Sequence, residues 1–305
     1  MAKIDAFFRL MNSQGASDLH MAAGCPPCLR VQGDVEPVKY HELTNDELFE
    51  MLAEITPEHK LKDFEETGHV DFAYELPGVS RYRANFFRQT NGTGAVFRQI
   101  PAKILTIDQL GLPSIARRFA LMEKGFVLVT GPTGSGKSTS LAAIVDYANR
   151  NRRAHIITVE DPIEFKHKRV NCLISHREIG PHTRSFSAAL RGALRQDPDI
   201  IMVGEMRDLE TITLALEAAA TGHLVFATLH TQSATKTIDR IIDVFPTDAK
   251  EQVRTTLADS LKGVISQSLL KRVDNRGRIA ALEIMVGTPA VANLIREGKT
   301  HLLQN

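Results

Sequence analysis

A glycine-rich segment with one lysine carries the clearest chemistry in this sequence. In "GPTGSGKST", Gly131 and the run Gly136-Lys137-Ser138 fit the G-x-x-x-x-G-K-[ST] pattern, with an apolar run before it and a helical pattern after it. Glycines let backbone N–H groups approach phosphate oxygens, and the helix adds its positive end. Lys137 is then expected at the terminal phosphates and the Ser138 hydroxyl on Mg²⁺. The predicted loop consists of Gly131, Pro132, Thr133, Gly134, Ser135, Gly136, Lys137, Ser138 and Thr139.

Three acidic residues follow the next apolar run, Ile156 to Val159. They are Glu160, Asp161 and Glu164, with a turn expected at Pro162. In open α/β sheets, ligands bind beyond the carboxyl ends of the strands. The cluster therefore predicts carboxylates that polarise water or hold a metal, against the ordinary alternative of surface acids.

A further acid, Glu205, follows the apolar run Ile200 to Val203 and Gly204. If this strand lies beside the phosphate-loop strand, Glu205 faces the magnesium. Its side chain reaches a metal-bound water more easily than the ion, because Mg²⁺ keeps several waters. Gly204 would leave room for the metal and its waters. The alternative is a solvated glutamate paired with Arg207 or Arg195, which is worth little energetically.

Two histidines bracket the run Leu224 to Ala227. His223 precedes it and His230 follows it, so only His230 is expected at the carboxyl end. His230 is a candidate for sensing the γ-phosphate or for contacting a neighbouring subunit. The ordinary alternative is a packed or hydrogen-bonded histidine.

The pattern of elements around these residues predicts two domains. From about residue 117, short apolar strands alternate with helical segments, which indicates an α/β domain with a parallel sheet covered by helices. Residues 1–100 mix two helices with a hairpin turning at Gln32-Gly33-Asp34 and three antiparallel strands, which indicates a smaller α+β domain. Pro101 and Pro113 mark a linker. The expected boundaries are 1–100, 101–116 and 117–305.

Composition excludes several classes of protein. The chain of 305 residues is 43% hydrophobic, with a net charge of +1 and no Trp. This composition predicts neither a strongly basic surface nor a channel lined by aromatic residues, so it does not favour binding of nucleic acid. The sequence contains no apolar run of about 18 residues, so no membrane span is predicted. The first twenty residues lack the apolar core of a signal peptide, which favours a location in the cytoplasm. Cys25 and Cys28 have no second C-x-x-C as a zinc partner, so we expect them to be structural or incidental.

Taken together, the motifs resemble those of one family. "GPTGSGKST", "TVEDPIE", "IIMVGEMRD" and "TGHLVFATLHT" are similar, in this order, to the Walker A motif, Asp box, atypical Walker B motif and His box of the type II/type IV secretion ATPases. Within that superfamily the chain most resembles the type IV pilus retraction ATPases, because "NLIRE" at 293–297 matches their C-terminal signature and the four-cysteine zinc motif of extension ATPases is absent. Ala290-Val291-Ala292 departs from the usual Ala-Ile-Arg. Relatives continue past the position of Asn305, so truncation of the C-terminal part is expected.

The resemblance implies a RecA-like P-loop ATPase core joined to a PAS-like N-terminal domain, assembled as a homo-hexamer with ATP between the two domains. It implies Glu160 or Glu164 as general base and Glu205 acting through Mg²⁺. His223 and His230 would form the His box. Positive charge for the γ-phosphate is expected from arginines. Arg81 and Arg83 share one strand face while Arg88 falls on the other. The candidates for phosphate-sensing or inter-domain contact are Arg81, Arg83 and Arg88, with Arg195 and Arg207 weaker.

The function implied is an ATP-hydrolysing motor for type IV pilus retraction and twitching motility. It would act at the cytoplasmic face of the inner membrane through the pilus platform protein, without binding nucleic acid. The alternatives are a pilus extension or type II secretion ATPase of the same superfamily, a DNA-translocating RecA-like ATPase, and a nucleotide switch that does not hydrolyse. Sequence patterns leave open the direction of work and the division of labour between Glu160, Glu164 and Glu205.

Overall fold

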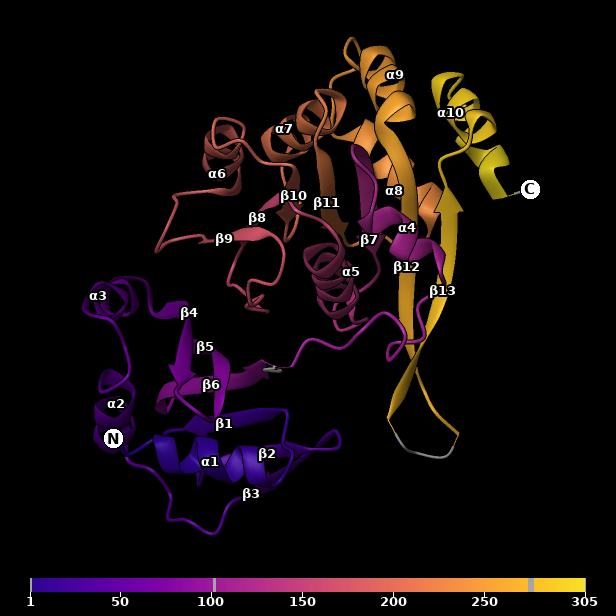
Figure 1. Cartoon of the computed structure of the whole chain (residues 1–305). Coiled ribbons are helices and arrows are strands. Elements are labelled where there is room, and N and C mark those ends of the chain that lie inside the picture. The colour runs from indigo at the N-terminus through magenta and orange to yellow at the C-terminus, as the bar shows by residue number, and fades with distance from the viewer. Residues whose placement is uncertain (1, 101–102, 274–276, 305) are drawn as a thin grey trace. The chain divides into compact units, whose positions relative to one another are not determined.

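The chain divides into two compact units, Met1–Lys103 and Ile104–Asn305. A computed structural model describes residues 2–100, 103–273 and 277–304, coloured along the chain in Figure 1. Pro101, at the start of the expected linker, lies outside the described residues, as does Asn305. Ile107 and Leu112 are buried in a cluster with helix α4 (Ile115–Ala120) and strand β7 (Gly125–Thr130) of the second unit. The stretch after residue 103 therefore packs as part of that unit.

The described part of the first unit is built on an antiparallel sheet of six strands in the order β3-β2-β1-β6-β5-β4. Three helices accompany it. The elements are α1 (Asp5–Ser13), β1 (Asp18–Ala22), β2 (Cys28–Val31), β3 (Asp34–Pro37), α2 (Asn45–Ala53), α3 (Glu58–Thr67), β4 (His69–Leu76), β5 (Ser80–Gln89) and β6 (Gly92–Ile100).

Local sequence explains these elements. The Thr44 side chain accepts the Glu47 N–H and caps α2, while Gly68 ends α3 in a left-handed conformation. The hairpin between β2 and β3 turns at Gln32-Gly33, as expected, with φ of 52° and 109°. The structure contains the predicted elements, namely the β2–β3 hairpin, helices α1 and α2, and strands β4 to β6. Strand β1 and helix α3 were not foreseen.

The described part of the second unit holds a seven-stranded sheet in the order β13-β12-β7-β11-β10-β8-β9. Its strands are parallel except for β13, which pairs antiparallel with β12. The elements are α4 (Ile115–Ala120), β7 (Gly125–Thr130), α5 (Lys137–Asn151), β8 (His155–Glu160), β9 (Leu173–Glu178), α6 (Phe186–Ala193), β10 (Ile200–Val203), α7 (Leu209–Ala220), β11 (Leu224–Leu229), α8 (Ala234–Asp243), α9 (Lys250–Ser260), β12 (Leu261–Lys271), β13 (Arg278–Val286), α10 (Pro289–Arg296) and the 3₁₀ helix η1 (Thr300–Gln304).

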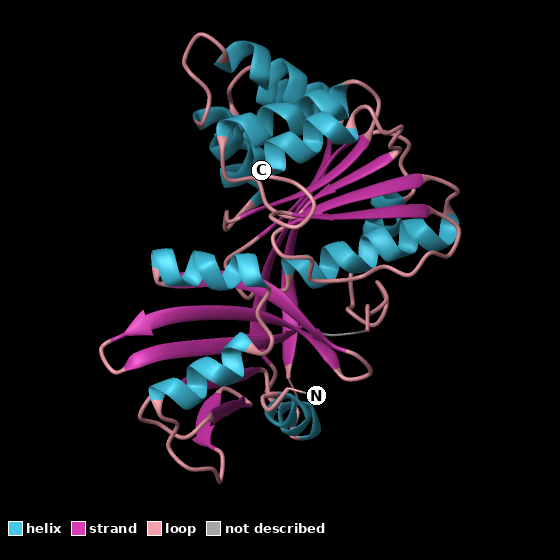
Figure 2. Ribbon diagram, turned by 90° about the vertical axis from the view of Figure 1, so that its left-hand side faces the viewer, coloured by secondary structure: helices cyan, strands magenta, loops and turns pink. Residues whose placement is uncertain are grey.

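Helices cover both faces of this sheet, as Figure 2 shows. On one face, Val127 and Val129 of β7 pack with buried side chains of α4 and α5. On the other face, Phe126 and Leu128 pack with side chains of α6, α7, α8 and α9. The alternation along β7 is that of a strand buried on both sides, which is why its sequence reads as a continuous apolar run. The predicted α/β core with a parallel sheet, and the smaller α+β domain, are confirmed.

The carboxyl ends of β7, β11, β10 and β8 share one edge of the sheet because these strands are parallel. Glu160 is the last residue of β8, and the predicted phosphate loop, Glu205 and His230 follow the ends of the other strands. The fold therefore gathers them along one edge. Within the described residues, every helix is too short or too polar to span a bilayer.

Candidate active site

The segment between β7 and α5 has the backbone of a phosphate loop. Gly131, Gly134 and Gly136 adopt φ of 142°, 77° and 86°, which side-chain-bearing residues rarely adopt. The Lys137 Nζ atom donates to the carbonyl oxygens of Gly131 at 2.9 Å and Pro132 at 3.0 Å. The ammonium group thus folds back over the loop, where it can meet terminal phosphate oxygens.

Polar groups of the loop suit an anion. Helix α5 begins after Gly136 and, among the described residues, has no side-chain cap on its first N–H groups. Ser135 is 2% exposed, and its Oγ atom has no hydrogen-bond partner within the described chain. Backbone donors at a helix start together with a buried hydroxyl are the groups that bind phosphate in proteins.

A chain of polar contacts leads from the loop to the strand β10. The His230 Nδ1 atom lies 3.5 Å from Lys137 Nζ, and its Nε2 atom lies 3.0 Å from Glu205 Oε1. Arg207 donates from Nη2 to Glu205 Oε2 at 2.7 Å. Glu205 therefore has one oxygen on His230 and the other on Arg207, and it is connected to the lysine through the imidazole.

The pKa shifts follow from these contacts. Burial lowers the pKa of the Lys137 ammonium below its ordinary value, and the negative charges of Glu205 and Glu164 oppose this. Burial would raise the pKa of the Glu205 carboxyl, but the Arg207 hydrogen bond and charge, followed by His230 and Lys137, bring it below its ordinary value. Glu205 is thus held as a carboxylate. Its charge and that of Glu164 offset only part of the effect of burial on the Lys137 pKa.

The condition set for the Glu205 strand is not met, and the expectation about Gly204 is wrong. Strand β10 does not lie beside β7, because β11 lies between them. Glu205 still reaches the loop because His230, at the end of β11, bridges the gap. Gly204 does not leave room for a metal: a Cβ there would meet the Val159 oxygen at 3.2 Å and Glu160 Cα at 3.3 Å. The glycine allows β8 to approach β10 closely.

The acidic turn after β8 is ordered by its own members. Glu160 is 7% exposed, and its Oε2 atom accepts the backbone N–H of Glu164 at 3.1 Å. Glu164 lies close enough to the loop for its charge to raise the pKa of Lys137. The structure therefore brings Glu164 and Glu205 into the electrostatic range of the phosphate-loop lysine, with Glu160 supporting the turn.

Comparison with known proteins shows the family of the chain. The family model described as "Type II/IV secretion system protein" matches residues 81–304. The chain belongs to this family. Its phosphate loop and its relatives identify it as an ATPase.

The chain is similar to several members of the type II/IV secretion system family. It is 56% identical over 94% of its length to the type IV pilus retraction ATPase PilT of Pseudomonas aeruginosa, of which it covers 83%. It is 53% identical over 91% of its length to a twitching motility protein of Neisseria gonorrhoeae, of which it covers 74%. A crystal structure of the pilus retraction motor PilT with bound ADP matches with a TM-score of 0.93 at 44% identity, covering the whole of this chain and 88% of that one.

Two predicted site residues of this secretion ATPase lie away from the loop. His223 precedes β11, and its Nδ1 atom lies 2.9 Å from the Ala218 oxygen. Arg195 is exposed after α6, before β10 begins. Both lie at the amino ends of parallel strands, which is the opposite edge from the phosphate loop. The structure therefore does not bring them to the loop of the same subunit.

The three arginines of the first unit divide as their spacing predicted. Arg81 and Arg83 lie on the outward side of β5, and Arg83 makes a half-exposed ion pair with Asp71 at 3.6 Å. Arg88 lies on the other side of the strand, where its guanidinium stacks over Phe64 at 5.7 Å. Its Nη2 atom also donates to the Glu65 carbonyl at 3.2 Å. Arg88 is thereby tied to α3.

Two buried residues that support the site were not predicted. Gln267 of β12 contacts the phosphate loop with its side-chain amide. Thr228 of β11 donates through Oγ1 to the Gly204 carbonyl, and its own carbonyl accepts the Met206 N–H at 3.1 Å. Thr228 thus holds the segment that carries Glu205. No local motif marks either residue, since each acts on a segment distant in sequence.

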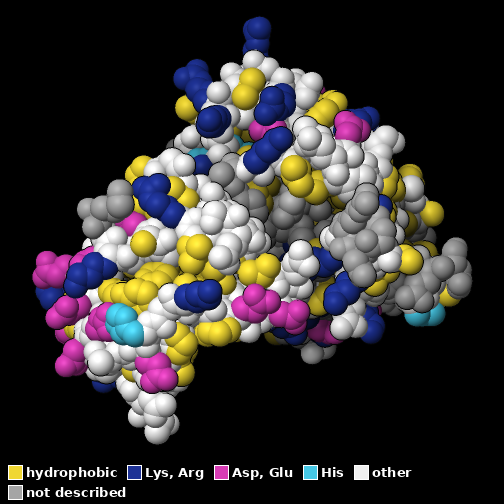
Figure 3. Space-filling model, turned by 90° about the horizontal axis from the view of Figure 1, so that it is seen from below, with side chains coloured by type: hydrophobic (Ala, Val, Ile, Leu, Met, Phe, Trp, Pro, Cys, Tyr) yellow, Lys and Arg dark blue, Asp and Glu magenta, His cyan; other side chains and the backbone are white. Residues whose placement is uncertain are grey.

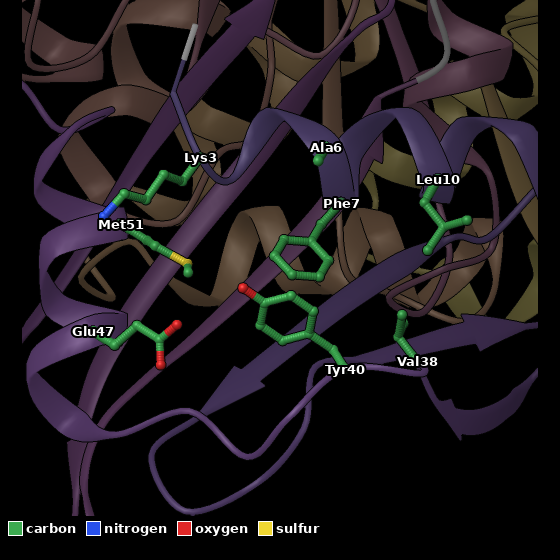
Figure 4. Close-up of a pocket in the computed structure, with 8 residues that line it drawn as sticks. All are labelled: Lys3, Ala6, Phe7, Leu10, Val38, Tyr40, Glu47 and Met51. Carbon is green, nitrogen blue, oxygen red and sulfur yellow. The ribbon is translucent and has the colours of Figure 1, made fainter.

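A pocket of the first unit contributes no predicted site residue. It has a volume of about 460 Å³, and Figure 4 shows the Phe7 and Tyr40 rings packed edge to face in it. Its walls are mostly apolar, with Lys3 and Glu47 as the charged residues among those that line it. Cys25 and Cys28 are free thiols, and their structural or incidental role stays a prediction.

Proposed function

We propose that this chain is the ATP-hydrolysing subunit of a hexameric motor that retracts type IV pili. The observation that carries the chemistry is the contact chain from Lys137 through His230 to Glu205 at the phosphate loop. The similarity to a pilus retraction ATPase over nearly the whole chain supports retraction as the task. ATP is the proposed substrate.

The loop would bind the phosphates through its backbone N–H groups and the Ser135 hydroxyl. Lys137 would place its charge on the terminal phosphate, where charge must be neutralised for phosphoryl transfer. Its lowered pKa reflects a partly buried ammonium, which interacts with phosphate more strongly than one in water. His230, which touches both Lys137 and Glu205, is placed to respond when the lysine moves onto a phosphate.

The residues present suit Mg²⁺. This ion usually keeps several waters and is bound through phosphates and one or two protein groups. The Ser138 hydroxyl in the first turn of α5 and the ionised Glu205 carboxylate are such groups, with Glu205 acting through a water. Mg²⁺ would supply charge neutralisation on the phosphates.

The base for the attacking water is best assigned to Glu164. Its charge acts on Lys137, whereas the Glu160 carboxylate is buried and accepts the Glu164 N–H. Glu160 would then position the turn. A base must come within hydrogen-bond reach of the proton that it removes, so a carboxylate whose charge reaches the loop lysine is favoured over a buried one that accepts a hydrogen bond within its own turn.

The remaining arginines and histidine fit roles between domains or subunits. We assign Arg81 and Arg83, on the outward face of β5, to closing on the phosphates during the motor cycle. Arg207 would orient Glu205. His223 and Arg195, at the opposite sheet edge, are candidates for contacts with a neighbouring subunit.

In this proposal the ring acts on the pilus platform protein at the cytoplasmic face of the inner membrane. Nucleic acid is not a partner. The face drawn in Figure 3 carries acidic as well as basic side chains, and the net charge of the chain is +1. A DNA channel would need a continuous positive surface.

The test is the phenotype of a strain that lacks the gene. Loss of twitching with retained or excess surface pili is expected, and the wild-type gene, but not a Lys137→Ala gene, should restore movement. Cells without pili would instead indicate an extension motor. Binding of the purified protein to DNA that weakens steeply with salt would favour the DNA-translocating alternative.

A further inference from the structure

The strand β12 runs directly beside the phosphate loop. Its parallel pairing with β7 extends to Ser266 opposite Thr130, so the next residue, Gln267, lies opposite Gly131. A Cβ on Gly131 would come within 2.1 Å of the Gln267 carbonyl oxygen. The first glycine of the motif is therefore required by β12 as well as by any phosphate.

The Gln267 side chain, 3% exposed, joins two parts of the loop-helix junction. Its Nε2 atom donates to the Ser135 carbonyl at 2.5 Å, and its Oε1 atom accepts from Ser140 Oγ at 2.7 Å. Since a carbonyl can only accept, the amide nitrogen must face Ser135, which leaves the oxygen for the hydroxyl. One amide thus holds the residue two before Lys137 and the residue three after it.

A second glycine of the motif makes room for this amide. A Cβ on Gly136 would come within 2.8 Å of Gln267 Nε2. Gln267 therefore fills the side of the loop where Gly131 and Gly136 have no side chains. Among the residues that Gln267 contacts, only those of the phosphate loop have a role in the proposed function.

We propose that Gln267 is a positioning residue that holds the phosphate loop in its phosphate-binding shape. This inference rests on the proposed nucleotide-binding function. A loop ordered before binding does not lose conformational entropy when the ligand arrives, so the anchor should act mainly on affinity. Without it, ATP and ADP should bind more weakly, while turnover at saturation changes little.

Nucleotide binding by the full chain tests the proposal. Gln267→Leu removes both hydrogen bonds and should raise the Kd for ATP and ADP by roughly tenfold, with kcat within about twofold. Gln267→Glu keeps the shape but cannot donate to Ser135, and it adds negative charge, so the loss should be larger for ATP than for ADP. Ser140→Ala removes one bond only, and an increase of about threefold is expected. Gln252→Leu, on the exposed surface of α9, is the matched control.

Adenosine provides the readout that separates positioning from general stability. It has no phosphate, so its binding, followed by saturation-transfer NMR, should be the same in wild type and in every variant. Unchanged ATP and ADP affinity in folded Gln267→Leu and Ser140→Ala would overturn the proposal, as would an equal loss for adenosine. If Gln267→Leu does not fold, Ser140→Ala and Gln267→Glu decide by the same criteria. Wild-type protein that binds no nucleotide would refute the proposed function instead.

Discussion

The Nε2 atom of His230 lies 3.0 Å from Oε1 of Glu205, across the ends of the neighbouring strands β11 and β10. This contact brings the carboxylate within the field of the phosphate-loop lysine, although one strand separates β10 from β7. Arg207 holds the other carboxylate oxygen. The position of the Glu205 carboxylate is therefore set by the side chains of His230 and Arg207, since its strand β10 is not a neighbour of β7.

Glu205→Gln should retain nucleotide binding and lose hydrolysis. The amide keeps the shape of the side chain but removes the charge that acts on a magnesium-bound water, so we expect turnover to fall by about 100-fold or more. Phosphate release and ADP affinity of the purified protein measure the two effects. Glu217→Gln, exposed on α7, is the control and should behave as wild type. Normal turnover in Glu205→Gln would leave Glu205 as a surface ion-pair partner of Arg207.

Glu164→Gln and Glu160→Gln should differ. If Glu164 is the base, its amide variant loses turnover by about 100-fold while binding persists. Glu160→Gln retains a side-chain oxygen that can accept the Glu164 N–H, so the turn is kept and a smaller loss is expected. Single-turnover hydrolysis with saturating ATP separates chemistry from binding. The reverse order of effects would move the base to Glu160.

Much of the fold and part of the site follow from local sequence. The phosphate loop is contiguous, so its motif, strand and helix are visible together, and the strand runs before Glu160, Glu205 and His230 are strongly apolar. Strand order is not local. The order of the strands places β11 between β10 and β7, and it places Gly204 against Glu160 of β8.

Contacts between distant segments were beyond prediction for the same reason. Gln267 lies 132 residues after Ser135, and no sequence pattern predicts that its strand is a neighbour of β7. Nothing in "VISQSLL" distinguishes an anchoring glutamine from a surface one. A buried amide becomes informative only when the groups that satisfy it are known.

Arg83→Ala should separate binding from turnover. Its ion pair with Asp71 is half-exposed and worth little, so the first unit should remain stable. If Arg83 closes on the phosphates, ring turnover should fall by about tenfold or more while the isolated subunit binds ADP normally. Arg88→Ala is the informative contrast: losing the contacts with Phe64 and Glu65 should lower stability by about 1 kcal/mol. Exposed Arg9→Ala serves as the control. Unchanged turnover in Arg83→Ala would remove Arg83 from the motor cycle.

A buried histidine should make the second unit sensitive to acid. His167 is 6% exposed, its ring stacks on His176 at 5.8 Å, and neither ring nitrogen has a hydrogen-bond partner among the described residues. Burial, and then the nearby His176, lower the pKa of His167 to about 4, with Asp146 opposing the shift. His167 is therefore neutral in the folded unit over the pH range in which an unfolded histidine becomes protonated.

The sign of the pH effect follows from this difference. As pH falls below about 6.5, the unfolded chain takes up the proton first, so the free energy of unfolding decreases until about pH 4. Between about pH 7 and pH 5 the loss due to His167 should be about 2 kcal/mol. His167→Phe keeps a ring but cannot titrate, so its Tm, measured by calorimetry, should fall less steeply with acid than that of wild type. His301→Phe, at an exposed position, should leave the wild-type slope unchanged. Equal slopes for His167→Phe and wild type would show that His167 is already protonated in the folded unit or that its burial carries no proton linkage.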